Sequence, residues 1–179
     1  MIAPDGYRAR LEDGGQEHRV WLDEASQRYF KATFPGRFGF TVVALPELGL
    51  ELVPATPLEY LERWLLQNSL FGDDMRLEGI ATEDAGLTVL ISQPNITGDA
   101  ATPDEIEAFM RQLWFRPLAG PELGGPGALG FYRDLDEVAA FDAHPGNFVK
   151  DRAGVLLPID LLLVRADAAM QTALASLLA

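Results

Sequence analysis

The chain has 179 residues, of which 48% are hydrophobic and 23% charged, and its formal net charge at pH 7 is −13. This length can bury a core without support from a metal or a disulfide. The absence of cysteine excludes disulfides, thiolate metal ligands and a cysteine nucleophile. The negative charge argues against nucleic acid as a partner, because phosphate repulsion opposes association and no basic cluster offsets it.

Two features bear on membranes and location. Residues 1–15 contain no apolar stretch of the kind found in signal peptides. The longest apolar run, 154–164, is too short to cross a bilayer and contains a proline and an aspartate. We therefore expect no membrane partner and a cytoplasmic location.

The first half of the chain reads as strands followed by a helix. Residues 17–23 and 28–34 flank a polar turn and predict an antiparallel hairpin, and residues 39–53 read as further extended segments. Thr56 as N-cap, Pro57 and Glu59 then form a capping-box start. This start predicts a helix over 57–71.

The second half alternates strands and helices. We predict a hairpin turning near 83–86, a helix from Thr102-Pro103 to about Leu113, a flexible glycine-rich loop at 120–130, a short strand at 131–134, a hairpin turning at 151–154 and a closing helix within 166–179. Local hairpins between helices indicate an α+β fold rather than βαβ winding.

The candidate chemistry lies between Asp142 and Asp160. On its own, residues 142–147 (DAHPGN) have an ordinary turn composition. However, Asn147 follows Asp142 by five residues, and Asp160 comes at the end of the next hairpin, so all three would reach one edge. Phosphoryl transfer needs a carboxylate that accepts the proton of the attacking hydroxyl, and an amide and a carboxylate that hold Mg²⁺.

These residues resemble a known superfamily. Asp142-x-x-x-x-Asn147 resembles the core of the catalytic loop of protein-kinase-like enzymes, and its HPGN wording is similar to that of aminoglycoside phosphotransferases. The order of motifs over about 16–165 looks most like the kinase-like domain of polyvalent proteins from phages and mobile elements. The resemblance implies transfer of a phosphoryl group from Mg²⁺-bound ATP. In this reaction Asp142 would be the catalytic base, and Asn147 and Asp160 would be the Mg²⁺ ligands.

The resemblance also implies roles earlier in the chain. Lys31 would hold the phosphates, and Glu62 of the first helix would orient it, with Glu59 as the other candidate. Glu62 is preferred because its leucine neighbours indicate the buried stripe. The adenine would meet backbone groups near Gln93, Asn95 and Ile96. The alternative interpretation makes Lys31 a solvent-facing strand residue and both glutamates surface charges.

The implied fold is a reduced two-lobed kinase-like one. Residues 1–95 would form an N-lobe with an antiparallel sheet and one main helix, and residues 96–179 a small C-lobe. Three departures stand out: no glycine-rich loop precedes Lys31 apart from Asp13-Gly14-Gly15, Asp142 directly follows Ala140-Phe141 and not the arginine of the kinase HRD motif, and only 19 residues follow Asp160. We therefore expect a phosphate acceptor that is small or is bound by another subunit or domain.

Other functions remain open on the sequence. The first alternative is a catalytically silent kinase-like module that binds a nucleotide or a protein, and the second is a structural interaction domain whose acids are surface charge. His144 is interpreted as a turn residue that caps a neighbouring carbonyl.

Overall fold

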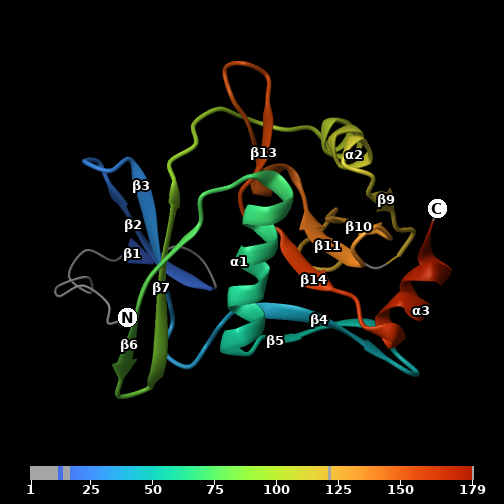
Figure 1. Ribbon diagram of the computed structural model, residues 1–179, viewed down its shortest axis with the longest axis horizontal. Coiled ribbons are helices and arrows are strands. Elements are labelled where there is room, and N and C mark those ends of the chain that lie inside the picture. Colours follow the sequence, from blue (N-terminus) through green and yellow to red (C-terminus); the bar gives the residue numbers. More distant parts are fainter. Residues whose placement is uncertain (1–11, 14–16, 121, 179) are drawn as a thin grey trace. The chain divides into compact units, whose positions relative to one another are not determined.

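The computed structural model describes residues 12–13, 17–120 and 122–178. These residues form three α-helices and antiparallel strands, which confirms the predicted mixed α+β fold (Figure 1). The chain divides into two compact units: unit 1 comprises residues 1–40 and 54–95, and unit 2 comprises residues 41–53 and 96–179. The last segment of unit 1 ends at Asn95. Residues 41–53, however, belong to unit 2 and not to the N-terminal part.

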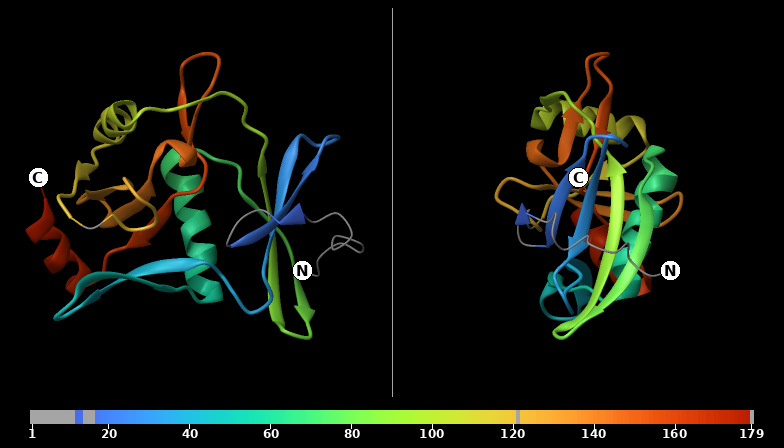
Figure 2. Two further views of the ribbon diagram at one scale, coloured as in Figure 1. Left: turned by 180° about the vertical axis from the view of Figure 1, so that it is seen from behind. Right: turned by 90° about the vertical axis from the view of Figure 1, so that its left-hand side faces the viewer.

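Unit 1 contains a five-stranded sheet in the order β1-β2-β3-β7-β6. Its strands are β1 (Glu12–Asp13), β2 (His18–Asp23), β3 (Arg28–Thr33), β6 (Arg76–Glu83) and β7 (Gly86–Pro94). The hairpins β2–β3 and β6–β7 lie where the sequence predicted them, and the second is seen along its length in the right-hand view of Figure 2. Inner strand β7, between β3 and β6, is buried at six consecutive positions.

Helix α1 (Pro57–Phe71) has the predicted bounds and capping box. Thr56 N donates to Glu59 Oε2 at 2.7 Å, and the helix ends at Gly72 in the left-handed region (φ +67°). Tyr60 and Trp64 of α1 pack into the core of unit 1. The chain thus follows local capping signals at both ends of this helix.

Unit 2 contains short strands in three sheets. The four-stranded sheet has the order β14 (Leu162–Arg165), β11 (Val138–Ala143), β10 (Leu129–Arg133) and β9 (Arg116–Pro117). A three-stranded sheet has the order β13 (Leu156–Pro158), β12 (Phe148–Lys150) and β8 (Asp99–Ala100), and strands β4 (Phe40–Leu45) and β5 (Gly49–Pro54) pair with each other. The predicted hairpin that turns at 151–154 is therefore confirmed as β12–β13.

Two helices complete unit 2. Helix α2 (Pro103–Gln112) begins with the predicted Thr102 and Glu105 capping box, and α3 (Ala168–Leu177) is the predicted closing helix. In Figure 1, α3 lies beside β4 and β5, and its Met170 and Leu174 pack in one core cluster with residues of β5, β11 and β14.

The candidate glycine-rich loop before Lys31 was Asp13-Gly14-Gly15, and both of its glycines lie outside the described residues. No helix within the described ranges is long and apolar enough to cross a membrane.

Candidate functional site

Asp142 and Asn147 are in direct contact in unit 2. Asn147 Nδ2 donates to the main-chain oxygen of Asp142 at 2.8 Å and to its carboxylate Oδ2 at 3.0 Å. A single amide group therefore fixes both the backbone and the carboxylate of Asp142. The other end of the amide, Asn147 Oδ1, accepts no hydrogen bond from any residue that the structure describes.

Asp160 reaches the same end of the sheet as Asp142. In the antiparallel pair β11–β14, Phe141 lies opposite Leu162. Asp142 directly follows Phe141, and Asp160 comes two residues before Leu162, so both aspartates lie at the same end of this pair. In addition, Ile159 N donates to the main-chain oxygen of Asn147 at 2.9 Å. Pairing of β11 with β14 and return of the β12–β13 hairpin thus bring together the three residues that the sequence singled out.

The backbone at Asp142 has an unusual conformation. Asp142 lies at the end of β11, not in a turn, and its φ is +57°, in the left-handed region that few non-glycine residues adopt. Its N–H donates to Leu123 O at 3.0 Å. Non-glycine residues in this region cluster at functional sites, where surrounding contacts hold the strain.

The glycine-rich segment lies against this aspartate. A Cβ atom at Gly124 would be 2.2 Å from Asp142 Oδ1, so only glycine permits the approach. Within the same segment Gly127 N donates to Glu122 Oε2 at 2.7 Å. The prediction of a flexible connection at 120–130 did not anticipate these contacts, and the sequence signal for them is limited to the adjacent glycines 124 and 125.

His144 faces Asp142 from the other side of the loop. His144 Nδ1 accepts a hydrogen bond from Gly146 N at 3.0 Å, and Nε2 lies 3.5 Å from Asp142 Oδ1. Because Nδ1 acts as an acceptor, a neutral ring carries its proton on Nε2, directed at the carboxylate. The prediction that His144 caps a carbonyl was therefore wrong, since it caps an amide.

The oxygen atoms of Asp142, Asn147 and Asp160 are donors of the type that a hard cation prefers. Aspartate carboxylates and an asparagine carbonyl oxygen are the ligand types that Mg²⁺ takes from proteins. Among the described residues no three histidine, aspartate or glutamate side chains form a group that could hold a metal. The group formed by Asp142, Asn147 and Asp160 contains only two carboxylates, and its third donor is the amide oxygen of Asn147.

Lys31 and Glu62 belong to unit 1. Lys31 lies on β3 between Val20 and Ile91, and its Nζ is 5.6 Å from the ring centroid of Trp64. This cation–π distance places the lysine against α1 and not in open solvent.

The prediction that Glu62 lies near the buried stripe of α1 was wrong. Glu62 is exposed, as are Leu58 and Leu65 at 65% and 67%, whereas Arg63 and Trp64 are buried. Residues two apart on a helix point about 200° apart, so Glu62 and Trp64 face nearly opposite directions. The structure gives no support to Glu62 as the partner of Lys31. The other candidate, Glu59, uses its carboxylate in the capping box.

The residues expected at the adenine lie around the end of β7. Gln93 is 6% exposed, opposite Tyr29 of β3, and its Oε1 has no hydrogen-bond partner among the described residues. Asn95 N donates to Gln27 O at 2.9 Å, and Ile96 is the first residue of the second segment of unit 2.

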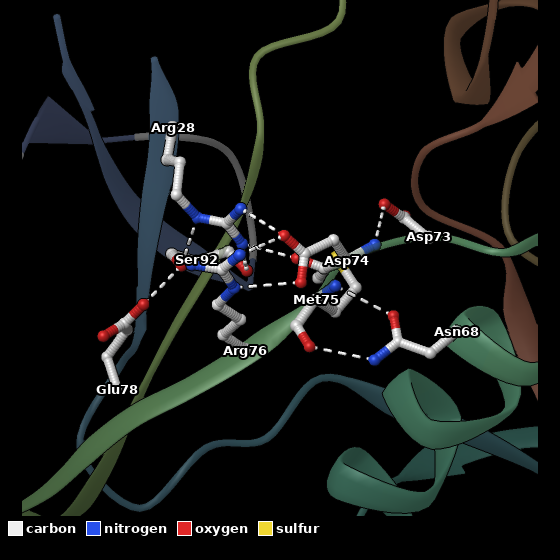
Figure 3. Close-up of polar contacts among 8 residues, drawn as sticks. All are labelled: Arg28, Asn68, Asp73, Asp74, Met75, Arg76, Glu78 and Ser92. Carbon is white, nitrogen blue, oxygen red and sulfur yellow. Dashed lines mark hydrogen bonds and ion pairs between the residues drawn. The ribbon is translucent and has the colours of Figure 1, made fainter. Parts of the chain in front are cut away.

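A buried arginine network that the sequence did not indicate joins Arg28 to Ser92, the residue before Gln93 (Figure 3). Arg28, 8% exposed, donates to Ser92 Oγ and to Asp74 Oδ2, both at 2.8 Å, and also to the main-chain oxygens of both residues. Ser92 Oγ in turn donates to Glu78 Oε1 at 2.5 Å. The network joins the start of β3 to the end of β7, and its partners are separated by 46 and 64 residues, which no local pattern reveals.

Comparisons with protein families, curated proteins and solved structures find no match to this chain.

Proposed function

We propose that the chain transfers a phosphoryl group from Mg²⁺-bound ATP, and that unit 2 supplies the proton acceptor and the metal ligands. The observation that carries the proposal is the double hydrogen bond from Asn147 Nδ2 to Asp142, which leaves Asn147 Oδ1 without a donor among the described residues. Protein-kinase-like enzymes require this combination of an aspartate base, an asparagine and a second aspartate.

Each residue has a defined role in the proposal. The Asp142 carboxylate, fixed by Asn147 and faced by His144, accepts a hydrogen bond from the acceptor hydroxyl and takes its proton as the phosphoryl group is transferred. Asn147 Oδ1 and the Asp160 carboxylate hold Mg²⁺. The ion neutralises charge on the phosphates when it is bound. The protein contributes mainly by positioning these groups.

The proposal keeps Lys31 as the residue that contacts the phosphates. Its support is the order of elements in unit 1, because Lys31 lies on a central strand of an antiparallel sheet and is followed by helix α1, as in the resembled N-lobe. Gln93, Asn95 and Ile96 remain the proposed adenine contacts.

A thermal-shift titration with the full chain tests metal-dependent nucleotide binding. We expect ATP with Mg²⁺ to raise the unfolding midpoint, and ATP with EDTA or Mg²⁺ alone to have a much smaller effect. At a ligand concentration of 100 times Kd, the stabilisation is about 2.7 kcal/mol. Asp160→Asn should abolish the Mg²⁺-dependent part. Asp104→Asn, at an exposed helix position in unit 2, is the matched control and should retain it.

Two results would refute binding at this site: no Mg²⁺-dependent shift, or an equal loss in the two variants.

The Asp142→Asn variant then separates nucleotide binding from the chemical step. It should bind Mg²⁺ and ATP but release phosphate at least about 100-fold more slowly, the usual contribution of a general base. Binding without turnover in the unaltered chain would instead favour the catalytically silent module.

A further inference from the structure

Helix α2 of unit 2 ends in a conformation that favours glycine but carries a tryptophan. Trp114 N donates to Arg111 O, and Phe115 N donates to Met110 O, both at 3.0 Å. This pair of bonds defines a Schellman ending, in which the residue after the cap is left-handed and usually glycine. Trp114 occupies that position with φ +66°.

The indole of Trp114 is also left in solvent. The side chain is 78% exposed and makes no ring stacking or cation–π contact with any described residue. A left-handed backbone is unfavourable for a bulky residue, and so is exposure of a large apolar surface. Two unfavourable features at one residue indicate that something outside the single chain compensates for them.

Trp114 lines a cleft of about 570 Å³. We call it the Trp114 cleft. It lies over the buried ring of Phe115 and is bordered by Arg111, Trp114, Arg116, Arg133, Asp134 and Leu135. Leu135, in the turn between β10 and β11, is 81% exposed. Exposed tryptophan and arginine around a buried aromatic residue is the composition of an interface centre.

The charge of the cleft differs from that of the whole chain. Its three arginines each contact an acid, at 2.8 Å for Arg111–Glu107, 3.0 Å for Arg116–Asp134 and 2.6 Å for Arg133–Asp136. These six side chains sum to zero, whereas the chain carries −13. A second molecule of the same charge would be repelled over the surface in general but can approach this cleft without net repulsion.

We propose that two copies of this chain associate through the Trp114 cleft about a two-fold axis. Each copy inserts Trp114 against the cleft of the other, as an isologous contact requires. The Arg116–Asp134 pair is self-complementary, because its side chains are 49% and 63% exposed and each can exchange its partner for the equivalent group across the axis. A small anionic ligand fits less well, because each arginine already has an acid partner. This association does not depend on the phosphoryl-transfer proposal.

Sedimentation equilibrium of the full chain tests the association. Over about 1–500 µM, which spans common homodimer affinities, we expect a reversible monomer–dimer equilibrium. Trp114→Gly should raise the dimer Kd at least about tenfold, as truncation of a central aromatic does. Because glycine suits the left-handed position, the same variant should unfold at an equal or higher temperature when measured as a monomer. Misfolding cannot produce that combination.

A matched pair of leucines provides the control. Leu135 lines the cleft, whereas Leu48, 68% exposed in the turn between β4 and β5, does not. Leu135→Ser should weaken the dimer and Leu48→Ser should leave it unchanged. A chain that stays monomeric over the whole range overturns the proposal. So does an unchanged dimer in Trp114→Gly, or an equal loss in the two leucine variants.

Discussion

The side-chain amide of Asn147 binds Asp142 at two points, its main-chain oxygen at 2.8 Å and its carboxylate at 3.0 Å. Removing this amide takes away one hydrogen bond to the partly buried carboxylate of Asp142 and one to its main-chain oxygen. We expect Asn147→Ala to lower the free energy of unfolding by about 1.5–3 kcal/mol, the range for hydrogen bonds to charged groups. Urea unfolding measures the loss.

A double-mutant cycle with Asp142→Ala isolates this contact from other effects of the two substitutions. If the amide acts through Asp142, the double variant should be more stable than the sum of the single losses predicts, by at least about 0.5 kcal/mol. Strict additivity would contradict the coupling.

Two glycines of one loop differ in their distance from Asp142. Both Gly124 and Gly127 have a positive φ, +112° and +74°. A Cβ atom added at Gly124 would lie 2.2 Å from Asp142 Oδ1, whereas a Cβ atom added at Gly127 would meet no atom within 4 Å. Gly127→Ala should therefore cost only the backbone strain, about 1 kcal/mol. Gly124→Ala should cost about 2 kcal/mol more, because the carboxylate must move.

Thermal unfolding of both variants checks this difference. Phosphate release from ATP should fall in Gly124→Ala and persist in Gly127→Ala, since only the first displaces the Asp142 carboxylate. Equal stability losses in the two variants would show that the loop does not restrain Asp142.

The elements that the sequence predicted correctly are those with local signals. The Thr56 and Thr102 capping boxes and the turn residues at 83–86 and 151–154 act within four residues of chain, so pattern and structure agree. The close placement of Asp142, Asn147 and Asp160 also followed from the order of a strand, a loop and a hairpin.

The errors concern residues whose environment depends on distant parts of the chain. The leucines of α1 indicated a buried stripe, but the helix buries Arg63, because Glu17 lies 46 residues away in sequence and next to it in space. The left-handed conformation of Trp114 had no signal either, because bulky residues rarely adopt it, and that of Asp142 had only the modest tendency of aspartate toward this region.

The ion pair between Glu105 and Lys150 in unit 2 makes stability depend on acid pH. The Lys150 ammonium, 2.8 Å away, together with the Thr102 cap, lowers the pKa of Glu105 from 4.5 to about 2. Since the folded pKa lies below the unfolded one, this contribution is full above about pH 4.5 and is lost as pH falls toward about 2.

Lys150→Met should therefore destabilise the chain at neutral pH, by an amount that shrinks as pH falls below about 4.5. Urea midpoints at several pH values measure this difference. Arg152→Met is the control, because Arg152 is an exposed cation in the same hairpin with no ion pair to a described residue. Its effect should not vary with pH over this range, and a constant difference in Lys150→Met would contradict the assigned cause.

Arg63 is a charge buried in the core of unit 1. It is 4% exposed, its Nη2 lies 2.8 Å from Glu17 Oε2, and its guanidinium lies 4.4 Å from the ring centroid of Trp64. Glu17→Gln removes the negative charge from this contact with the guanidinium. We expect a loss of about 3–5 kcal/mol in the free energy of unfolding, as for other broken buried pairs.

The cost of removing one partner differs from the worth of the pair. Replacing both residues by methionine removes one buried and one half-buried charge and keeps most of the apolar contact with Trp64, so the double variant should recover at least half of the single loss. Arg111→Ala, which removes an exposed pair on α2, should change stability by less than about 0.5 kcal/mol when measured on the monomer. If Glu17→Gln is as mild as Arg111→Ala, the Arg63 guanidinium is not desolvated in the folded chain.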